Sequence, residues 1–253
     1  MEPDTTGYAD VNGLHLYYET YGEGPPLVLL HAGMMTIEAS FAPLIPALAQ
    51  RFRVIGVEAQ GHGRTANIDR PITYVNLAAD VVALLDHLGI DAAHVMGHST
   101  GAGTVLELIT AHGDRVLRAV PLSGSVRADG MVDFSEPGAF ERYADKLPTE
   151  ADLAAMREGY ERLSPHPERF DEFFAYMSTS DAGFAGWTDE QLAGVTASTL
   201  IVQGDNDFAT NEHAALMKTL IPGSQLLILP GTTHMGVPRR VDLLLPALES
   251  FLG

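Results

Sequence analysis

The sequence predicts an α/β fold: a mostly parallel, doubly wound sheet with an N-terminal antiparallel hairpin and a helical cap insertion. Three observations lead to this prediction. Short apolar runs alternate with segments of helical spacing along most of the 253 residues. An Asn-Gly pair separates the first two strand-like runs, and residues 125–190 carry helical patterns without a convincing buried strand. Strands joined by crossovers of helix length are typical of parallel sheets with helices on both faces.

The first half of the chain starts with the hairpin, in which residues 8–11 and 14–21 flank Asn12-Gly13, a favoured two-residue turn. In a parallel sheet this hairpin can only be an antiparallel edge. Short apolar runs predict buried strands at 27–30, 53–57 and 93–96. Helices are predicted at 43–50 and 74–88, and Gly89 follows the second helix as a C-cap glycine would.

The second half predicts the same alternation around one interruption. Helices are expected at 101–112, 211–220 and 241–252, and strands at 117–122, 199–203 and 225–229. Residues 1–124 and 191–253 therefore form the expected core, and 125–190 form the cap. The cap holds 10 of the 19 aromatic residues and 15 acidic against 6 basic residues. That composition fits a lid over an apolar cleft, and it fits equally well amphipathic helices that simply pack on the sheet.

Composition narrows the classes of function. A formal net charge of −18 would repel nucleic acid phosphates and anionic lipids, so neither is an expected partner. The absence of cysteine excludes a thiolate nucleophile, disulfides and a zinc site with sulfur ligands. We expect a cytoplasmic protein, because neither a signal peptide nor an apolar run of about 18 residues is present. The expected partner is a small-molecule substrate. The oligomeric state stays open.

The pentapeptide Gly97-His98-Ser99-Thr100-Gly101 carries the main chemical signal. It lies between a predicted strand and a predicted helix, where a sharp turn needs small residues two positions before and after the serine. Such a turn presents the serine hydroxyl at a helix N-terminus, where backbone N–H groups favour negative charge. We therefore predict that Ser99 is a nucleophile. The structural alternative is a glycine-rich helix start with an N-cap serine.

A nucleophilic serine needs a base and an orienting carboxylate, which should follow later strands. His234 comes just after the last predicted strand and is the candidate base. Two aspartates follow the strand before it. We prefer Asp207 as the acid, because the first aspartate after a strand, Asp205, more often stabilises the turn itself. The order Ser, Asp, His is the one expected of this type of sheet.

An oxyanion hole should combine the N–H of Thr100, directly after the nucleophile, with one N–H from the loop after the first parallel strand. In that loop Gly33 is the first choice of donor and Met34 is the second. The substrate pocket is expected to draw on apolar residues of nearby loops and of the cap, namely Met34, Met35, Phe134, Phe140, Trp187, Phe208 and Met235.

These motifs together resemble the α/β-hydrolase superfamily, in its compact, capped, esterase- and lactonase-like branch. His31-Ala32-Gly33 is similar to the family's His-Gly-x loop, and residues 61–65, Gly-His-Gly-Arg-Thr, are similar to its Gly-His-Gly-x-Ser segment. The resemblance covers nearly the whole chain. Three positions depart from the pattern: Ala32 replaces glycine, Glu58 replaces aspartate and Thr65 replaces serine. Ala32 would cost roughly 1 kcal/mol or more if its position needed a positive φ.

His62 and His98 are interpreted as residues that tie loops together, and not as catalytic groups. No cofactor or metal is implied. The segment 205–207 lacks the downstream spacing of an EF-hand, Gly101 and Gly103 lack the third glycine of a dinucleotide fingerprint, and the chain has no phosphate-binding Gly-Lys-Ser/Thr.

The resemblance, with serine rather than aspartate at the turn, implies a cofactor-independent hydrolase of small to medium apolar carboxylic esters or lactones that forms an acyl-enzyme. Two alternatives stay open. The same residues could cleave a C–C bond or perform perhydrolysis, and relatives of this fold also act as small-molecule receptors. Ser99→Ala should abolish ester turnover without loss of folding. Activity should fall at acid pH, because the base must be neutral to accept a proton.

Overall fold

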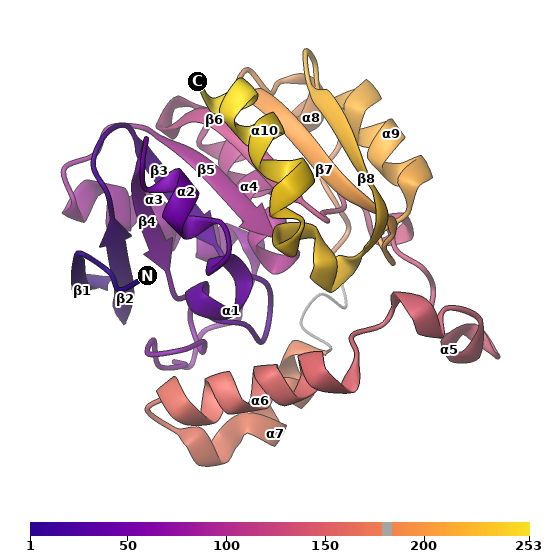
Figure 1. The fold of residues 1–253 in the computed structure, drawn as a ribbon, viewed down its shortest axis with the longest axis horizontal. Helices are drawn as coiled ribbons and strands as arrows, with labels where there is room; N and C mark the ends of the chain where they lie inside the picture. The colour runs from indigo at the N-terminus through magenta and orange to yellow at the C-terminus, as the bar shows by residue number, and fades with distance from the viewer. Residues whose placement is uncertain (179–183) are drawn as a thin grey trace.

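The computed structural model describes residues 1–178 and 184–253, and an eight-stranded sheet of order β1-β2-β4-β3-β5-β6-β7-β8 runs through its centre (Figure 1). Both pairings of β2, with β1 and with β4, are antiparallel, and every pairing from β4 to β8 is parallel. The predicted fold class, including the antiparallel edge, is therefore confirmed. The strands are β1 (Thr5–Val11), β2 (Leu14–Tyr21), β3 (Pro26–Leu30), β4 (Arg53–Val57), β5 (Ala93–His98), β6 (Val116–Leu122), β7 (Ser198–Asn206) and β8 (Gln225–Thr233).

The core helices lie close to where the sequence predicts them, with one exception. The helix expected at 43–50 is only α2 (Ile45–Leu48), and another short helix, α1 (Ile37–Phe41), precedes it. The side chain of Thr36 caps α1 by accepting from the backbone N–H of Ala39. The other core helices are α3 (Tyr74–His87), α4 (Thr100–Ala111), α9 (Asn211–Leu220) and α10 (Val241–Leu252).

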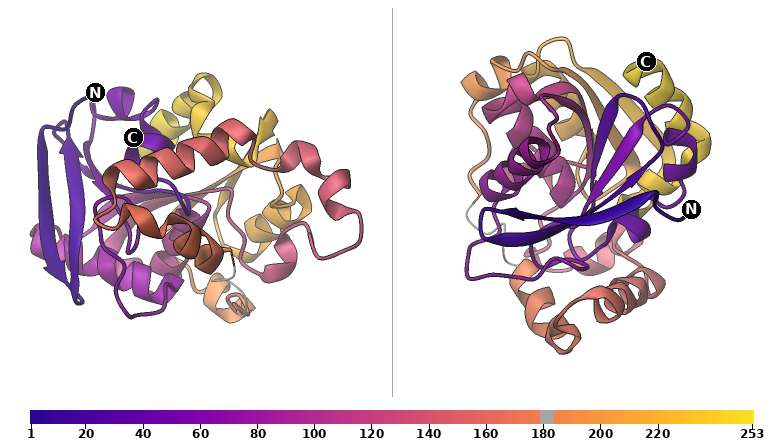
Figure 2. Two further views of the ribbon diagram at one scale, coloured as in Figure 1. Left: turned by 90° about the horizontal axis from the view of Figure 1, so that it is seen from below. Right: turned by 90° about the vertical axis from the view of Figure 1, so that its left-hand side faces the viewer.

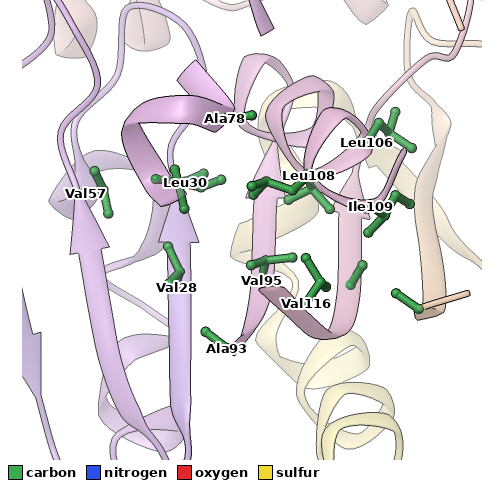
Figure 3. Packing of buried hydrophobic residues seen from close by; sticks show 14 of the residues in the cluster. Val28, Leu30, Val57, Ala78, Ala93, Val95, Leu106, Leu108, Ile109 and Val116 are labelled. Atoms are coloured by element: carbon green, nitrogen blue, oxygen red, sulfur yellow. The ribbon is translucent and has the colours of Figure 1, made fainter. Parts of the chain in front are cut away.

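Alternate residues of the central strands point to opposite faces of the sheet, so each face has its own core. Val28 and Leu30 of β3 belong to one buried cluster with residues of α3, α4 and α9, part of which Figure 3 shows, whereas Leu27 and Leu29 belong to a second cluster with residues of α1, α2 and α10. Helices therefore cover both faces of the sheet, as is required when the central strands are apolar on both sides. The carboxyl ends of the parallel strands are left at one end of the sheet.

The segment expected to be a cap lies at that end of the sheet, as Figures 1 and 2 show for its longest helices. Its helices are α5 (Ala139–Arg142), α6 (Glu150–Leu163), α7 (Phe170–Met177) and α8 (Asp189–Ala193). A capping box between Thr149 and Asp152 starts α6. Residues 179–183 of the expected range 125–190 lie outside the described residues. None of the described helices is both long enough and apolar enough to cross a membrane.

The two ends of the cap meet at a short stem. The backbone N–H of Trp187 donates to the carbonyl oxygen of Val126 over 3.1 Å, so the outgoing and returning chains lie side by side. Beyond the stem, Trp187 and Leu192 are buried in the core on the α4 face of the sheet, and the indole of Trp187 donates to Glu107 over 2.7 Å. The described residues that extend over the carboxyl ends of the strands thus lie between the two stem residues, Val126 and Trp187.

Candidate active site

Ser99 occupies a strained turn between β5 and α4. Its φ of 54° and ψ of −112° lie in a region that residues with a side chain rarely adopt. The turn is tight on both sides: a Cβ on Gly97 would lie 2.2 Å from the Gly101 oxygen, and one on Gly101 would lie 2.1 Å from the Leu30 oxygen. The backbone N–H of Ser99 donates to Leu122 of β6 over 2.9 Å. These contacts fix the serine at the N-terminus of α4, where it is only partly buried.

His234 and Asp207 form a buried pair, 3% exposed in each case, at the ends of β8 and β7. Nδ1 of His234 lies 2.8 Å from Oδ1 of Asp207, which also accepts from the backbone N–H of Ala209 over 3.0 Å. Burial by itself would raise the pKa of Asp207, but the histidine, the Ser123 hydroxyl and the Ala209 amide together hold it below its ordinary value. Asp207 is therefore a carboxylate that can orient the imidazole and leave Nε2 for other partners.

The side chain of Asp205, the aspartate that was not preferred, bonds the end of the neighbouring strand β8, whereas the sequence predicts that it stabilises its own turn. Its Oδ1 accepts from the backbone N–H of Thr232 over 3.0 Å, and this joins the loop after β7 to the end of β8. The amides of Thr232 and Gly231 lower the pKa of its carboxyl. Asp205 thus stabilises the loops that carry Asp207 and His234.

Two rings hold the His234 imidazole in place. Phe208 stacks on it at a centroid distance of 3.8 Å and an angle of 25°. Nε2 of His98 lies 3.0 Å from the His234 carbonyl oxygen, so His98 must carry its proton on that nitrogen. Burial lowers the pKa of His98 to about 3, with a further contribution from His234. His98 is therefore a neutral support.

The oxyanion candidates lie on two segments in contact. A Cβ on Gly33 would lie 2.9 Å from Oγ1 of Thr100. Within the described residues, the backbone N–H groups of Gly33 and Thr100 donate no hydrogen bond. The N–H of Met34, the second choice, donates to Nε2 of His62 over 3.0 Å, which favours Gly33. Met34 itself has a φ of 62°, while Ala32 has no positive φ, so the departure at Ala32 costs no left-handed strain.

His31 and His62 tie the surrounding loops together. Nε2 of His31 accepts from the backbone N–H of Ala59, and Nδ1 donates to the Ala32 oxygen. His62 uses Nδ1 in the same way, donating to the Gln60 oxygen. Burial lowers the pKa of His31 to about 4 and that of His62 to about 3. Both rings are neutral and accept a backbone N–H, so they shape the loop that carries Gly33.

Glu58 and Thr65, the two other departures from the family pattern, fit the structure through local bonds. Glu58 is buried and accepts from Arg64 through both the backbone N–H and the guanidinium, at 2.6 and 2.8 Å. A Cβ on Gly63 would lie 2.2 Å from the Glu58 carboxyl carbon, which explains the glycine. The hydroxyl of Thr65 donates to the Glu58 carbonyl oxygen and accepts from Tyr17.

Ser123 is a site residue that sequence reasoning missed. It follows β6, has a φ of 56° and is fully buried. Among the described residues, neither its Oγ nor Oδ2 of Asp207 has a partner at hydrogen-bond geometry, yet the hydroxyl is near enough to lower the pKa of Asp207. No sequence signal could have singled it out, because a serine after a strand is ordinary.

Two cavities of about 200 and 210 Å³ adjoin the candidate nucleophile and share Thr100. The first is lined by Ser99, Ser123 and Arg127 among others, and the second by Gly33, Met34 and cap residues. A larger cavity of about 410 Å³ lies away from them, against β2 and the N-terminal residues. Among the described residues, no three His, Asp or Glu side chains are grouped to hold a metal ion.

The predicted pocket residues fall into different places. Met34 lines the second cavity, and Met35 and Met235 are buried in the same apolar cluster as Met156 of α6. Phe208 lies on the His234 ring. The structure places the remaining three away from the lining of both cavities: Phe134 contacts Phe208 and Phe140, Phe140 is 60% exposed, and Trp187 is in the core.

A family model described as alpha/beta hydrolase fold matches residues 25–155. The RutD protein of Azorhizobium caulinodans, named as a carbamate hydrolase, is 38% identical over 125 residues, 49% of this chain and 47% of that protein. The chain thus spans about half the length of this relative.

Several solved structures match nearly the whole chain. Est816, titled an N-acyl homoserine lactone degrading enzyme, has a TM-score of 0.79 and 27% identity, with 96% of this chain and 99% of that chain covered. The enol-lactonase from Burkholderia xenovorans LB400 has a TM-score of 0.74 and 26% identity, with 97% and 99% covered. The family model covers more than half of the sequence, and the chain therefore belongs to the alpha/beta hydrolase fold family.

Proposed function

We propose that this protein is a serine hydrolase that cleaves small to medium carboxylic esters or lactones through an acyl-enzyme. One observation carries the proposal: a buried His234–Asp207 pair, joined at 2.8 Å, lies at the end of the sheet where a strained turn presents Ser99. Buried imidazole–carboxylate pairs and serines with positive φ are both costly, and they persist where chemistry requires them.

In the first half of the proposed reaction, Oγ of Ser99 attacks the carbonyl carbon and Nε2 of His234 takes the hydroxyl proton. The resulting oxyanion accepts from the N–H groups of Thr100 and Gly33, which have no other acceptor among the described residues. Collapse breaks the bond to the alcohol oxygen, and the imidazolium returns its proton to that leaving group. Asp207 stabilises the imidazolium between these steps.

In the second half, water attacks the acyl carbon and gives its proton to His234. The second oxyanion collapses, the bond to Ser99 breaks, and the serine oxygen regains the proton as the carboxylic acid leaves. A lactone follows the same steps, except that the alcohol stays attached to the acyl group as one hydroxy acid.

The comparisons support the type of bond. Two of the solved structures that match nearly the whole chain are named for lactone substrates, and RutD is named for a carbamate, in which a carbonyl also bears an ester-like oxygen. A lactone and a carbamate each contain a carbonyl next to oxygen, which is the kind of bond proposed here.

Active-site labelling tests the proposal directly. A fluorophosphonate probe, followed by intact mass measurement, should add one adduct to the wild-type protein and none to Ser99→Ala. Ser125→Ala is the matched control, because Ser125 lines the same cavity, and it should still be labelled. Turnover should then be measured on 4-nitrophenyl acetate, a lactone panel, a peracid assay and a C–C diketone substrate.

The outcome distinguishes the candidate functions. Many turnovers on esters or lactones, lost in Ser99→Ala, would support the proposal. Turnover only on the diketone or in the peracid assay would replace it by one of those activities, and labelling with about one turnover would favour a receptor.

A further inference from the structure

The two cavities beside Ser99 differ in chemistry. The one that contains Met34 is bounded by apolar cap side chains, mainly Leu153, Met156, Phe174 and Met177. The one that contains Ser99 is also partly apolar, through Met131 and Phe184, but it adds serine and threonine hydroxyls and a single charged side chain among the described residues, Arg127. A substrate that bridges both cavities through Thr100 would meet apolar surface on one side and a guanidinium on the other.

Arg127 is held in place through its backbone. Its N–H donates to Oγ of Ser125 over 3.2 Å, and the Ser125 hydroxyl bonds to the Arg127 carbonyl oxygen. Nε2 of His213, from α9, lies 3.1 Å from Ser125 Oγ and accepts from the backbone N–H of Val126. On the other side Gly186 is so near that a Cβ there would lie 3.0 Å from the Arg127 Cα. The base of the side chain is therefore fixed at the stem of the cap.

The head of this side chain is only partly used. Nη2 pairs with Asp189, and no other acceptor among the described residues takes a hydrogen bond from the guanidinium. A guanidinium has five N–H donors in a planar fork that matches a carboxylate. The Arg127 side chain is 33% exposed, whereas that of Asp189 is 62% exposed, so the pairing carboxylate faces solvent more than the arginine does. Donors are left for a second anion.

The charge of the molecule makes this arginine unusual. The chain carries −18 in total, and its 15 acidic residues between 125 and 190 outnumber the 6 basic ones. A negatively charged substrate would be repelled by that field unless a fixed cation stood beside the reacting groups. Arg127 is such a cation, on the wall of the cavity that contains Ser99.

We propose that the substrate is an ester or lactone that bears a carboxylate arm, which Arg127 binds, and an apolar portion that lies in the cavity of Leu153, Met156, Phe174 and Met177. This inference rests on the proposed function, and it specifies the substrate class of the same site. Asp189 competes with the substrate carboxylate for the guanidinium. Removal of Arg127 should therefore weaken binding of the charged substrate, and removal of the Asp189 charge should strengthen it.

Two substrate pairs test the proposal without assuming which half of the ester enters which cavity. Phenyl hydrogen adipate is compared with phenyl hexanoate, which places the carboxylate in the acyl half. The other pair is 4-(butanoyloxy)benzoate and phenyl butanoate, which places it in the alcohol half. In one pair the wild-type enzyme should prefer the charged ester. Arg127→Gln should lower that preference about 10- to 100-fold, as expected for a hydrogen bond to a charged group, and leave the neutral ester nearly unchanged.

Three further variants sharpen the reading. Arg127→Lys should retain part of the preference, because it keeps the charge and loses the fork. Asp189→Asn should increase the preference, because it removes the competing carboxylate. Arg142→Gln, a cap arginine that is 55% exposed and outside both cavity linings, makes the same change of charge and should leave the ratio unaltered.

Binding separates this inference from the proposed function. Phenyl hydrogen adipate and 4-(butanoyloxy)benzoate should each be titrated into Ser99→Ala and into Ser99→Ala/Arg127→Gln by calorimetry. If the charged esters bind Ser99→Ala more tightly than Ser99→Ala/Arg127→Gln, the anion site is supported even if no ester is turned over. The inference is overturned if Arg127→Gln changes neither the substrate ratio nor the binding more than Arg142→Gln does.

Discussion

The backbone at Ser99 stores strain that a pair of substitutions can measure. Its φ of 54° and ψ of −112° are accessible to glycine at little cost, but not to alanine or serine. Ser99→Ala and Ser99→Gly both lack the hydroxyl, so a comparison of the two isolates the backbone from the chemistry. We expect the glycine variant to be the more stable of the two.

The magnitude follows from two opposing effects. A residue held in such a sparsely populated region costs about 1–3 kcal/mol, which glycine relieves. Glycine also gives the unfolded chain more freedom, which costs about 0.4–1 kcal/mol. Ser99→Gly should therefore exceed Ser99→Ala in free energy of unfolding by roughly 1 kcal/mol.

Urea unfolding at neutral pH provides the assay. The two variants are compared at an equal m-value, the slope of the free energy of unfolding against urea concentration. Ser198, the exposed first residue of β7, supplies the matched control, because extended backbone suits alanine. There the glycine variant should be the less stable by about 0.5–1 kcal/mol. If the pair at Ser99 shows the same sign and size as the pair at Ser198, the turn holds no strain and the reasoning is refuted.

Further outcomes concern the neighbours of Ser99. Asp207→Asn keeps an oxygen for His234 but removes the charge, which at about 4 Å and an effective dielectric constant near 20 is worth about 4 kcal/mol, so kcat/KM should fall about 10³-fold. Asp207→Ala should fall further, because it also removes the acceptor oxygen, and a wild-type kcat/KM in Asp207→Asn would show that the charge is unimportant. Ser123→Ala should lower kcat/KM by about 3- to 10-fold through the lost hydroxyl beside Asp207, and steady-state kinetics that match wild type would exclude that role. His62 is neutral when folded, with its pKa lowered to about 3, but is protonated below its ordinary 6.5 when unfolded. Acidification from pH 7.5 to 5 should therefore lower the free energy of unfolding of wild type by about 2 kcal/mol more than that of His62→Asn, as measured by urea unfolding. Equal decreases in the two proteins would contradict this.

The strands and long helices could be predicted because each is marked by burial or by spacing. The run at 27–30 is apolar on both faces, as a central parallel strand must be, and α3 has a regular apolar stripe. α1 was missed because a helix of five residues has too little length for a periodic pattern, and only the capping Thr36 marks its start. Local packing, and not intrinsic preference, forms such single turns.

The candidate site shows a similar division. Chain order predicted an aspartate after β7 and a histidine after β8, and Asp207 and His234 are 2.8 Å apart, although Asp205 bonds mainly Thr232 of β8 and not its own turn. Side-chain direction could not be read in the same way. Aromatic composition suggested pocket roles for Phe140 and Trp187, but one faces solvent and the other bonds Glu107 in the core. Which way an aromatic points depends on the packing of the short cap helices, which no spacing pattern encodes.

The stem between Val126 and Trp187 has a consequence for how this protein can diversify. Since the outgoing and returning chains are already joined there, a segment of different length or sequence could be grafted onto the same two points without shifting the register of β6 and β7. Evolution, or an engineer, could thus exchange the covering segment and keep Ser99, Asp207 and His234 unaltered. Recombination at these two positions would be the most economical route to a relative with a new specificity.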